Sequence, residues 1–402
     1  MKKFDSIESL RGWMAWWVVI GHAFHISGTT PRFPNPFVIL NYGGWAVAVF
    51  MIISGFVIAH MLSVREEPYG RYMVRRAFRL YPIYLFCLVI ALLITQYYLA
   101  AYFDNAWAKL GDMRAEKVES EAAHFWTHIA AHLAMAHGLV PEEVLPFAAI
   151  SFLGPAWSLS LEWQFYVLAP LLVWAVTARG MVSYAVLVVA AAVAIPARFG
   201  LFGTWVEPAF LPLALEFFLA GIISRIALDP GGLRRAVPGI LLLLTVCAAA
   251  VIAKPATLIT YTFVGAIWVF ALCAVNVESG KHPERWPAAL RWLFRTTLDN
   301  PVAAWLGRIS FSTYLIHIPI LTLTVGVGVR HFGVESHAQV IALTVLAFPI
   351  IVAASHVLYV TIEQPGVRAG QATLKWMARG KATPATSPTP EPGDLKSPGQ
   401  AR

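Results

Sequence analysis

Hydrophobic residues fill this chain in long runs, and charged residues or Pro and Gly interrupt the runs. An α-helix needs about 20 consecutive apolar residues to cross the hydrocarbon core of a bilayer. Run length and the positions of the interruptions predict ten membrane-spanning helices. They lie near residues 10–28, 42–63, 77–102, 157–178, 181–197, 209–228, 236–253, 256–276, 302–329 and 338–362. The pattern therefore predicts an all-α, polytopic transmembrane bundle.

Composition agrees with a membrane protein and narrows its partners. Of the 402 residues, 58% are hydrophobic and only 13% are charged, whereas a soluble domain carries about 25% charged residues. The net charge of +8 does not indicate a nucleic-acid partner, because in a membrane protein the placement of positive charge matters more than its sum. Cys87, Cys247 and Cys273 all lie in apolar runs, so we expect neither a disulfide framework nor a metal cluster.

Basic residues are distributed unevenly over the connecting segments. With the N-terminus in the cytoplasm, all but seven of the 30 Lys and Arg residues lie on cytoplasmic segments. The seven are Arg32, Lys109, Arg114, Lys117, Arg198, Lys254 and Arg330. The positive-inside rule then predicts that both termini are cytoplasmic. We expect residues 1–366 to form the transmembrane domain, the outer connection 103–156 to form a short surface helix, and the Pro/Ser/Thr-rich residues 367–402 to be a largely disordered tail.

The first predicted helix contains ionisable side chains at positions that share one face. Arg11 and His22 are eleven residues apart, which at 100° per residue is only about 20° past three full turns. His22 therefore lies about 16 Å further into the bilayer than Arg11, on the same face. His25 follows one turn later. A snorkelling arginine and a hydrogen-bonded histidine would explain these residues structurally, whereas ionisable groups inside a membrane also indicate a functional site.

Two further segments place charge at the membrane. Arg76 and Arg79 lie three residues apart at the start of the third predicted span, and such a pair suits either anionic lipid and topology or a phosphate-rich ligand from the cytoplasm. Glu162 lies inside apolar sequence in the fourth span. A lone carboxylate in a membrane must be protonated or paired with Arg or His from a neighbouring helix. In the second span, Gly55 predicts close helix packing.

In order along the chain, these segments resemble one family, the membrane acyltransferase family 3. The matching motifs are an arginine followed after ten residues by a histidine (Arg11 to His22), Ser-Gly-Phe at 54–56, Arg-x-x-Arg at 76–79, "WSLSLEWQFY" and "LGRISFSTYLIHIPIL". The resemblance covers residues 5–366. It implies a bacterial inner-membrane enzyme that moves an acyl group, commonly acetyl from acetyl-CoA, onto a hydroxyl of a glycan or other envelope acceptor. Some members carry an extra esterase-like domain, which we do not expect in this protein.

The resemblance assigns roles to the ionisable residues. His22 is the candidate general base, because imidazole has an ordinary pKa near 6.5, and a transient acyl-imidazole stays open as an alternative. Glu162 is a second catalytic candidate, and it or another carboxylate would orient the second nitrogen of His22. Arg76 and Arg79 would bind CoA phosphates, and Arg11 would line the donor route or pair with a carboxylate such as Glu363. The predicted substrate-binding side chains are Ser54, Trp157, Tyr166, Tyr314 and His317.

Two other interpretations compete with this one. His124, His128 and His132 have the helical spacing of a zinc site, but no acidic or cysteine partner is evident in the sequence, so no metal and no permanently bound cofactor is predicted. A multi-span transporter of an envelope precursor would also use buried Arg, His and Glu. Inverted repeats with broken helices would favour the transporter, and the sequence shows none.

Overall fold

The computed structural model describes residues 4–109, 111–278 and 287–379, and these residues form helices without a strand. The all-α fold class is confirmed. The helices are α1 (Asp5–Ser27), α2 (Gly43–Val64), α3 (Tyr69–Leu93), α4 (Thr95–Leu99), α5 (Gly111–Ala123), α6 (Phe125–Leu133), α7 (Trp157–Thr177), α8 (Met181–Arg198), α9 (Leu215–Ala227), α10 (Gly232–Arg235), α11 (Val237–Ala253), α12 (Thr257–Glu278), α13 (Ala288–Thr297), α14 (Pro301–His331), α15 (His337–Leu358) and α16 (Gln364–Arg379).

Shorter helical turns connect several of these helices. The 3₁₀ segments are η1 (Pro36–Asn41), η3 (Ala148–Ile150), η4 (Gly154–Ala156) and η5 (Leu211–Leu213), and the π segments are η2 (Ala100–Asp104) and η7 (Tyr359–Glu363). The segment η7 joins α15 to α16 without a break, so helix continues past the predicted domain boundary at residue 366. The rest of the predicted tail, residues 380–402, lies outside the described residues.

By length and composition, seven helical stretches of the described chain are long and apolar enough to cross a membrane. They are Gly43–Val64, Tyr69–Leu93, Gly154–Thr177, Met181–Arg198, Thr257–Asn276, Pro301–His331 and His337–Ala378. The three remaining predicted spans correspond to α1, α9 and α11. The helices α9 and α11 are short, and α1 contains Arg11, His22 and His25. The number and length of these helices indicate a multi-pass membrane protein. The count of ten spans stays a prediction.

Glycines set the closest helix crossings. A side chain at Gly307 of α14 would collide with the backbone carbonyl of Glu8, and one at Gly12 of α1 would lie 2.8 Å from the Gly307 nitrogen. Gly55 of α2 and Gly221 of α9 pack against each other's helices in the same way, through Phe218 and Ile52. The predicted packing role of Gly55 is confirmed. The α1–α14 crossing brings the charged face of α1 against the "ISFSTYLIH" stretch of α14.

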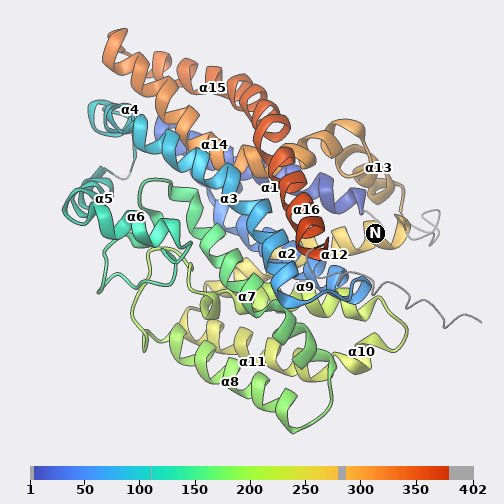
Figure 1. Cartoon of the computed structure of the whole chain (residues 1–402). Coiled ribbons are helices and arrows are strands. Elements are labelled where there is room, and N and C mark those ends of the chain that lie inside the picture. Colours follow the sequence, from blue (N-terminus) through green and yellow to red (C-terminus); the bar gives the residue numbers. More distant parts are fainter. Residues whose placement is uncertain (1–3, 110, 279–286, 380–402) are drawn as a thin grey trace, which may run out of the picture.

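The arrangement of the helices gives the bundle two distinct ends. Figure 1 shows the N-terminus and α13 at one end and α5 and α6 at the other. The outer connection is more buried than the predicted surface helix, since the rings of His128 and His132 on α6 are fully buried. Which end faces the cytoplasm remains a prediction from the distribution of basic residues.

Candidate functional site

A cavity of about 80 Å³, which we call cavity A, lies where α1, α2, α3, α7 and α14 meet. Its polar lining comes from all five helices and contains Arg11, Ser54, Arg76, Arg79, Ser158, Glu162, Tyr166, Ser310 and Tyr314. Three guanidinium groups and one carboxylate make it a positively charged pocket. Such a lining is suited to a ligand that carries phosphate or carboxylate groups.

The two arginines of α3 face cavity A together, as their spacing predicts. Arg76 is buried, with its guanidinium carbon 5.4 Å from the Tyr166 ring centre, and its Nη2 donates to the Met61 sulfur. Its Nε has no hydrogen-bond partner among the described residues. Arg75, the neighbouring arginine, instead forms an ion pair of 2.8 Å with Glu67. Arg76 therefore retains donor capacity that the protein itself does not use.

Glu162 belongs to cavity A and has its own partners. Its Oε1 accepts a hydrogen bond of 2.9 Å from Ser54 and a short one from Tyr166. Neither bond reaches His22, whose Nδ1 has no partner among the described residues. The hypothesis that Glu162 orients His22 is wrong for this arrangement, because the two side chains line different cavities.

A second cavity of about 240 Å³, which we call cavity B, contains His22. Its polar side chains are His22, His25, Asn41, Tyr98, Arg114, Lys117, Trp157, Glu207 and Tyr314. They come from α1, α7 and α14 and from the connections η1, α4, α5 and 199–210. Cavity B is larger than cavity A, and its lining residues Arg114 and Lys117 belong to α5, which Figure 1 shows opposite the N-terminus.

His22 sits against two other imidazole rings. Its ring centre is 5.2 Å from that of His317 on α14 and 6.2 Å from that of His25. His317 is fully buried, with its Nδ1 3.2 Å from the Thr313 carbonyl and its Nε2 without a partner among the described residues. An imidazole at a polar cavity wall can accept a proton from a bound hydroxyl.

Tyr314 is the residue that lines both cavities. Its hydroxyl lies 2.8 Å from the Ser158 Oγ and donates to the Pro155 carbonyl at 3.1 Å. Its ring contacts Phe50, a lining residue of cavity A, with 5.7 Å between ring centres. The Tyr314 side chain thus stands between the arginines of one cavity and the histidines of the other.

The structure groups the predicted site residues into these two cavities. Arg11, Ser54, Arg76, Arg79, Glu162 and Tyr166 line cavity A, His22 and Trp157 line cavity B, and Tyr314 lines both. The His317 ring lies next to that of His22 at a tilt of 39°. Arg11 and His22 do face inward together, but Arg11 pairs with Glu8 at 3.6 Å. Glu363 instead accepts a hydrogen bond from Ser312, so the proposed Arg11–Glu363 pair is not formed.

The histidines of α6 have structural partners. His128 Nε2 lies 3.2 Å from the Ser120 Oγ, and His132 lies 2.7 Å from the Tyr84 hydroxyl and 2.8 Å from Ser151. The His132 and His137 rings stack at 4.1 Å. Within the described residues, no group of three or more His, Cys, Asp or Glu is arranged to hold a metal ion. These rings anchor the outer connection to α3.

Sequence reasoning missed the functional candidates that the connections supply. Arg114 and Lys117 of α5 and Glu207 of the 199–210 loop all line cavity B. Their sequence signal is weak, since charged residues in loops are usually solvated. The one available signal was that Arg114 and Lys117 are exceptions to the positive-inside distribution.

Glu207 lies in the wall of cavity B, where its carboxylate has no hydrogen-bond or ion-pair partner among the described residues. Burial raises its pKa from 4.5 to about 7. Wild-type stability should therefore fall as the pH rises from 4.5 to 7, because the folded protein binds a proton more tightly than the unfolded chain. Glu207→Gln removes this cost. We expect its melting temperature to exceed the wild-type value by about 2–4 °C near pH 8 and to match it below about pH 4.5.

Thermal unfolding in detergent at the two pH values measures this difference. An equal offset at both pH values would show that the Glu207 side chain does not carry the proton. Glu143, an exposed acid held by Thr204, provides the matched control, and Glu143→Gln should not show the same pH-dependent gain.

The helices and the two cavities place the chain in the class of multi-pass helical membrane proteins with polar cavities between their helices. The family model described as "Acyltransferase domain" (Acyl_transf_3) matches residues 4–359. The chain therefore belongs to this acyltransferase family, and the resemblance drawn from its motifs is confirmed.

A curated relative agrees with this assignment. The chain is 26% identical to "Acyltransferase MdmB" of Streptomyces mycarofaciens over 362 residues, which are 82% of each protein. No solved structure matches the chain. Family membership and this distant relative support an O-acyltransferase activity.

Proposed function

We propose that the protein transfers an acyl group, commonly acetyl, from acyl-CoA bound at cavity A to a hydroxyl of an acceptor bound at cavity B. The observation that carries the proposal is the pair of cavities that share Tyr314, one lined by arginines and the other by His22. The acceptor is a glycan, a lipid-linked sugar or another envelope molecule, and the enzyme acts in the bacterial inner membrane.

The volume and charge of cavity A indicate which part of the acyl-CoA donor it receives. Cavity A, at about 80 Å³, is far below the roughly 300–1,000 Å³ of pockets that enclose drug-sized ligands. It therefore receives the acyl-pantetheine end, while the nucleotide stays at the predicted cytoplasmic mouth. Arg76 and Arg79 supply planar, charged donors for phosphate at that mouth.

The transfer itself needs a base and a short path between reactants. His22 takes the proton of the acceptor hydroxyl, whose oxygen attacks the thioester carbonyl and forms a tetrahedral oxyanion. The carbon–sulfur bond then breaks, the ester forms, and the proton on His22 passes to the CoA thiolate. The thioester end of the donor has to reach past Tyr314 to the acceptor in cavity B, and holding both reactants there lowers the entropic cost of the encounter.

Purified protein in detergent or liposomes should release free CoA from acetyl-CoA when a hydroxyl acceptor is present. A thiol-reactive dye measures the CoA, and radiolabelled acetyl measures the ester product. Methyl glucoside, lipid-linked sugars and hydroxylated small molecules form the acceptor panel. Transport of an acceptor into liposomes without release of CoA would contradict the proposal and favour a transporter.

A further inference from the structure

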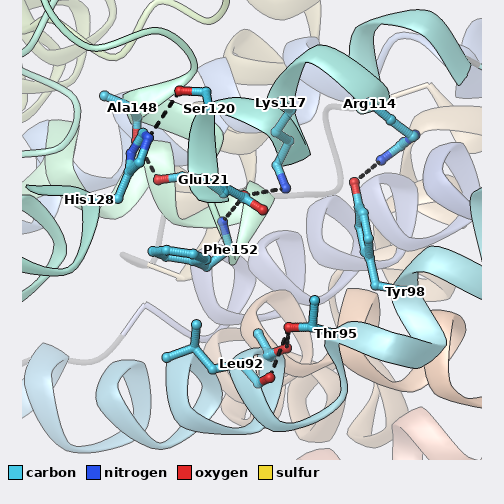
Figure 2. A network of polar contacts seen from close by, with 12 residues as sticks. Leu92, Thr95, Tyr98, Arg114, Lys117, Ser120, Glu121, His128, Ala148 and Phe152 are labelled. Atoms are coloured by element: carbon cyan, nitrogen blue, oxygen red, sulfur yellow. Dashed lines mark hydrogen bonds and ion pairs between the residues drawn. The ribbon is translucent and has the colours of Figure 1, made fainter. Parts of the chain in front are cut away.

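Arg114 is a cation in cavity B that has no acidic partner among the described residues. Its Nη1 donates a hydrogen bond of 2.8 Å to the Tyr98 hydroxyl, and its guanidinium carbon lies 3.6 Å from the ring centre of Tyr102. Figure 2 shows Arg114 pointing from α5 toward Tyr98. The two tyrosines fix the position of the guanidinium group, but they do not neutralise its charge.

The neighbouring cation on the same helix, Lys117, differs from Arg114 because it has an acidic partner. Lys117, one turn further along α5, forms an ion pair of 2.6 Å with Glu121, which in turn accepts a hydrogen bond from the Phe152 backbone. Figure 2 shows this pair beside Arg114. Charges removed from water are normally paired in this way, because an unpaired one costs free energy. Arg114 therefore requires another explanation.

The unused donors of Arg114 indicate what it binds. Its Nε is buried and has no acceptor among the described residues, and unsatisfied buried donors are rare in folded proteins. With Nη1 bonded to Tyr98, the edge formed by Nε and Nη2 remains free for an oxygen that carries negative charge.

The position of Arg114 relates this charge to the reacting groups. Arg114 lines cavity B together with His22 and His25. Glu207, an acid without an ion-pair partner in the described chain, also lines cavity B, and above about pH 7 its ionised carboxylate would repel an acceptor with a permanent negative charge. A negative charge that exists only during the reaction, close to His22, fits both observations.

We propose that Arg114 is a catalytic residue, which stabilises the oxyanion formed on the acyl carbonyl when the acceptor hydroxyl loses its proton to His22. The inference rests on the proposed acyl transfer. In the addition step the carbonyl π electrons move to the oxygen, and the guanidinium charge faces that oxygen. In the collapse step the electrons return, the thiolate leaves, and the Arg114 interaction weakens. A group that binds the transition state more tightly than the substrate raises kcat.

Steady-state kinetics of Arg114 variants test the assignment, with acetyl-CoA as donor and methyl glucoside or water as acceptor. Arg114→Met should lower kcat about 10²–10³-fold, the usual cost of removing one oxyanion donor. The KM values for donor and acceptor should change less than about threefold. Arg114→Lys should restore part of kcat, since it supplies charge without the fork. Tyr98→Phe, which only loosens the guanidinium, should cost about tenfold in kcat.

The control is Lys109→Met, which removes an exposed positive charge just before α5 and should keep the wild-type kcat. Wild-type kcat in Arg114→Met, or a loss confined to the acceptor KM, would overturn the proposal. If Arg114→Met does not fold, the Arg114→Lys and Tyr98→Phe variants test the proposal instead. An unchanged kcat in both of these variants would overturn the proposal. A wild-type protein that releases no CoA contradicts acyl transfer itself, and this is seen before any variant is made.

Discussion

Replacing His22 by glutamine should abolish acyl transfer while the protein still inserts, folds and binds acyl-CoA. His22 lines cavity B, and its Nδ1 has no partner among the described residues. Loss of a general base typically lowers the rate about 10²–10⁴-fold. Turnover of acetyl-CoA, donor binding and thermal unfolding, measured on the same preparation, separate a chemical defect from a folding defect.

His25 is the internal control for this experiment. Its ring is 6.2 Å from that of His22 and lines the same cavity, so a general packing loss would affect both positions. His22 is one turn closer to Arg11, and therefore to the cavity that receives the donor. We expect His25→Gln to lose less activity than His22→Gln. An active His22→Gln enzyme, or a loss at His25 alone, would assign the base to another residue.

Replacing Arg76 or Arg79 by alanine should weaken binding of the acyl-CoA donor and leave binding of the acceptor almost unchanged. A hydrogen bond to a charged group contributes about 1.5–3 kcal/mol, which corresponds to a rise of about ten- to a hundred-fold in the KM for acetyl-CoA. The acceptor KM should change little, because these side chains line cavity A and not cavity B. Initial rates at varied acetyl-CoA and fixed acceptor measure the effect, and lysine should rescue it in part.

Arg75 provides the matched comparison on the same helix. It pairs with Glu67 and is not among the residues that line cavity A, so Arg75→Ala should leave the donor KM near the wild-type value. An equal rise in all three alanine variants would assign the cluster to membrane attachment or topology. Unchanged donor kinetics at Arg76 and Arg79 would exclude them from the donor site.

The periodicity of the sequence was sufficient to predict the features that depend on a single helix. The separation of eleven positions from Arg11 to His22 fixes their shared face, and the separation of three positions from Arg76 to Arg79 fixes theirs. In the structure each pair faces the interior. Gly55 likewise predicted a close helix crossing, because a residue without a side chain lets two backbones approach each other. The geometry of an α-helix alone determines these relations.

Features that depend on how helices meet were not accessible from the sequence. Glu162 has Ser54 as a partner because α2 and α7 pack beside each other, and no spacing along the chain encodes that contact. Arg114 and Glu207 reach cavity B from connections whose paths depend on the whole bundle. Sequence-based expectations therefore identified most of the residues but did not divide them between two cavities.

The separation of the cavities by Tyr314 has an energetic consequence for a cell. An energised membrane stores about 2.3 kcal/mol for each elementary charge per 100 mV, and a continuous water-filled path would dissipate that store as a proton leak. The Tyr314 ring and its hydrogen bonds to Ser158 and Pro155 occupy the place where the two cavities approach each other. Under the proposed acyl transfer, only the neutral acyl group would pass Tyr314, so the acceptor would be modified without a proton leak across the membrane.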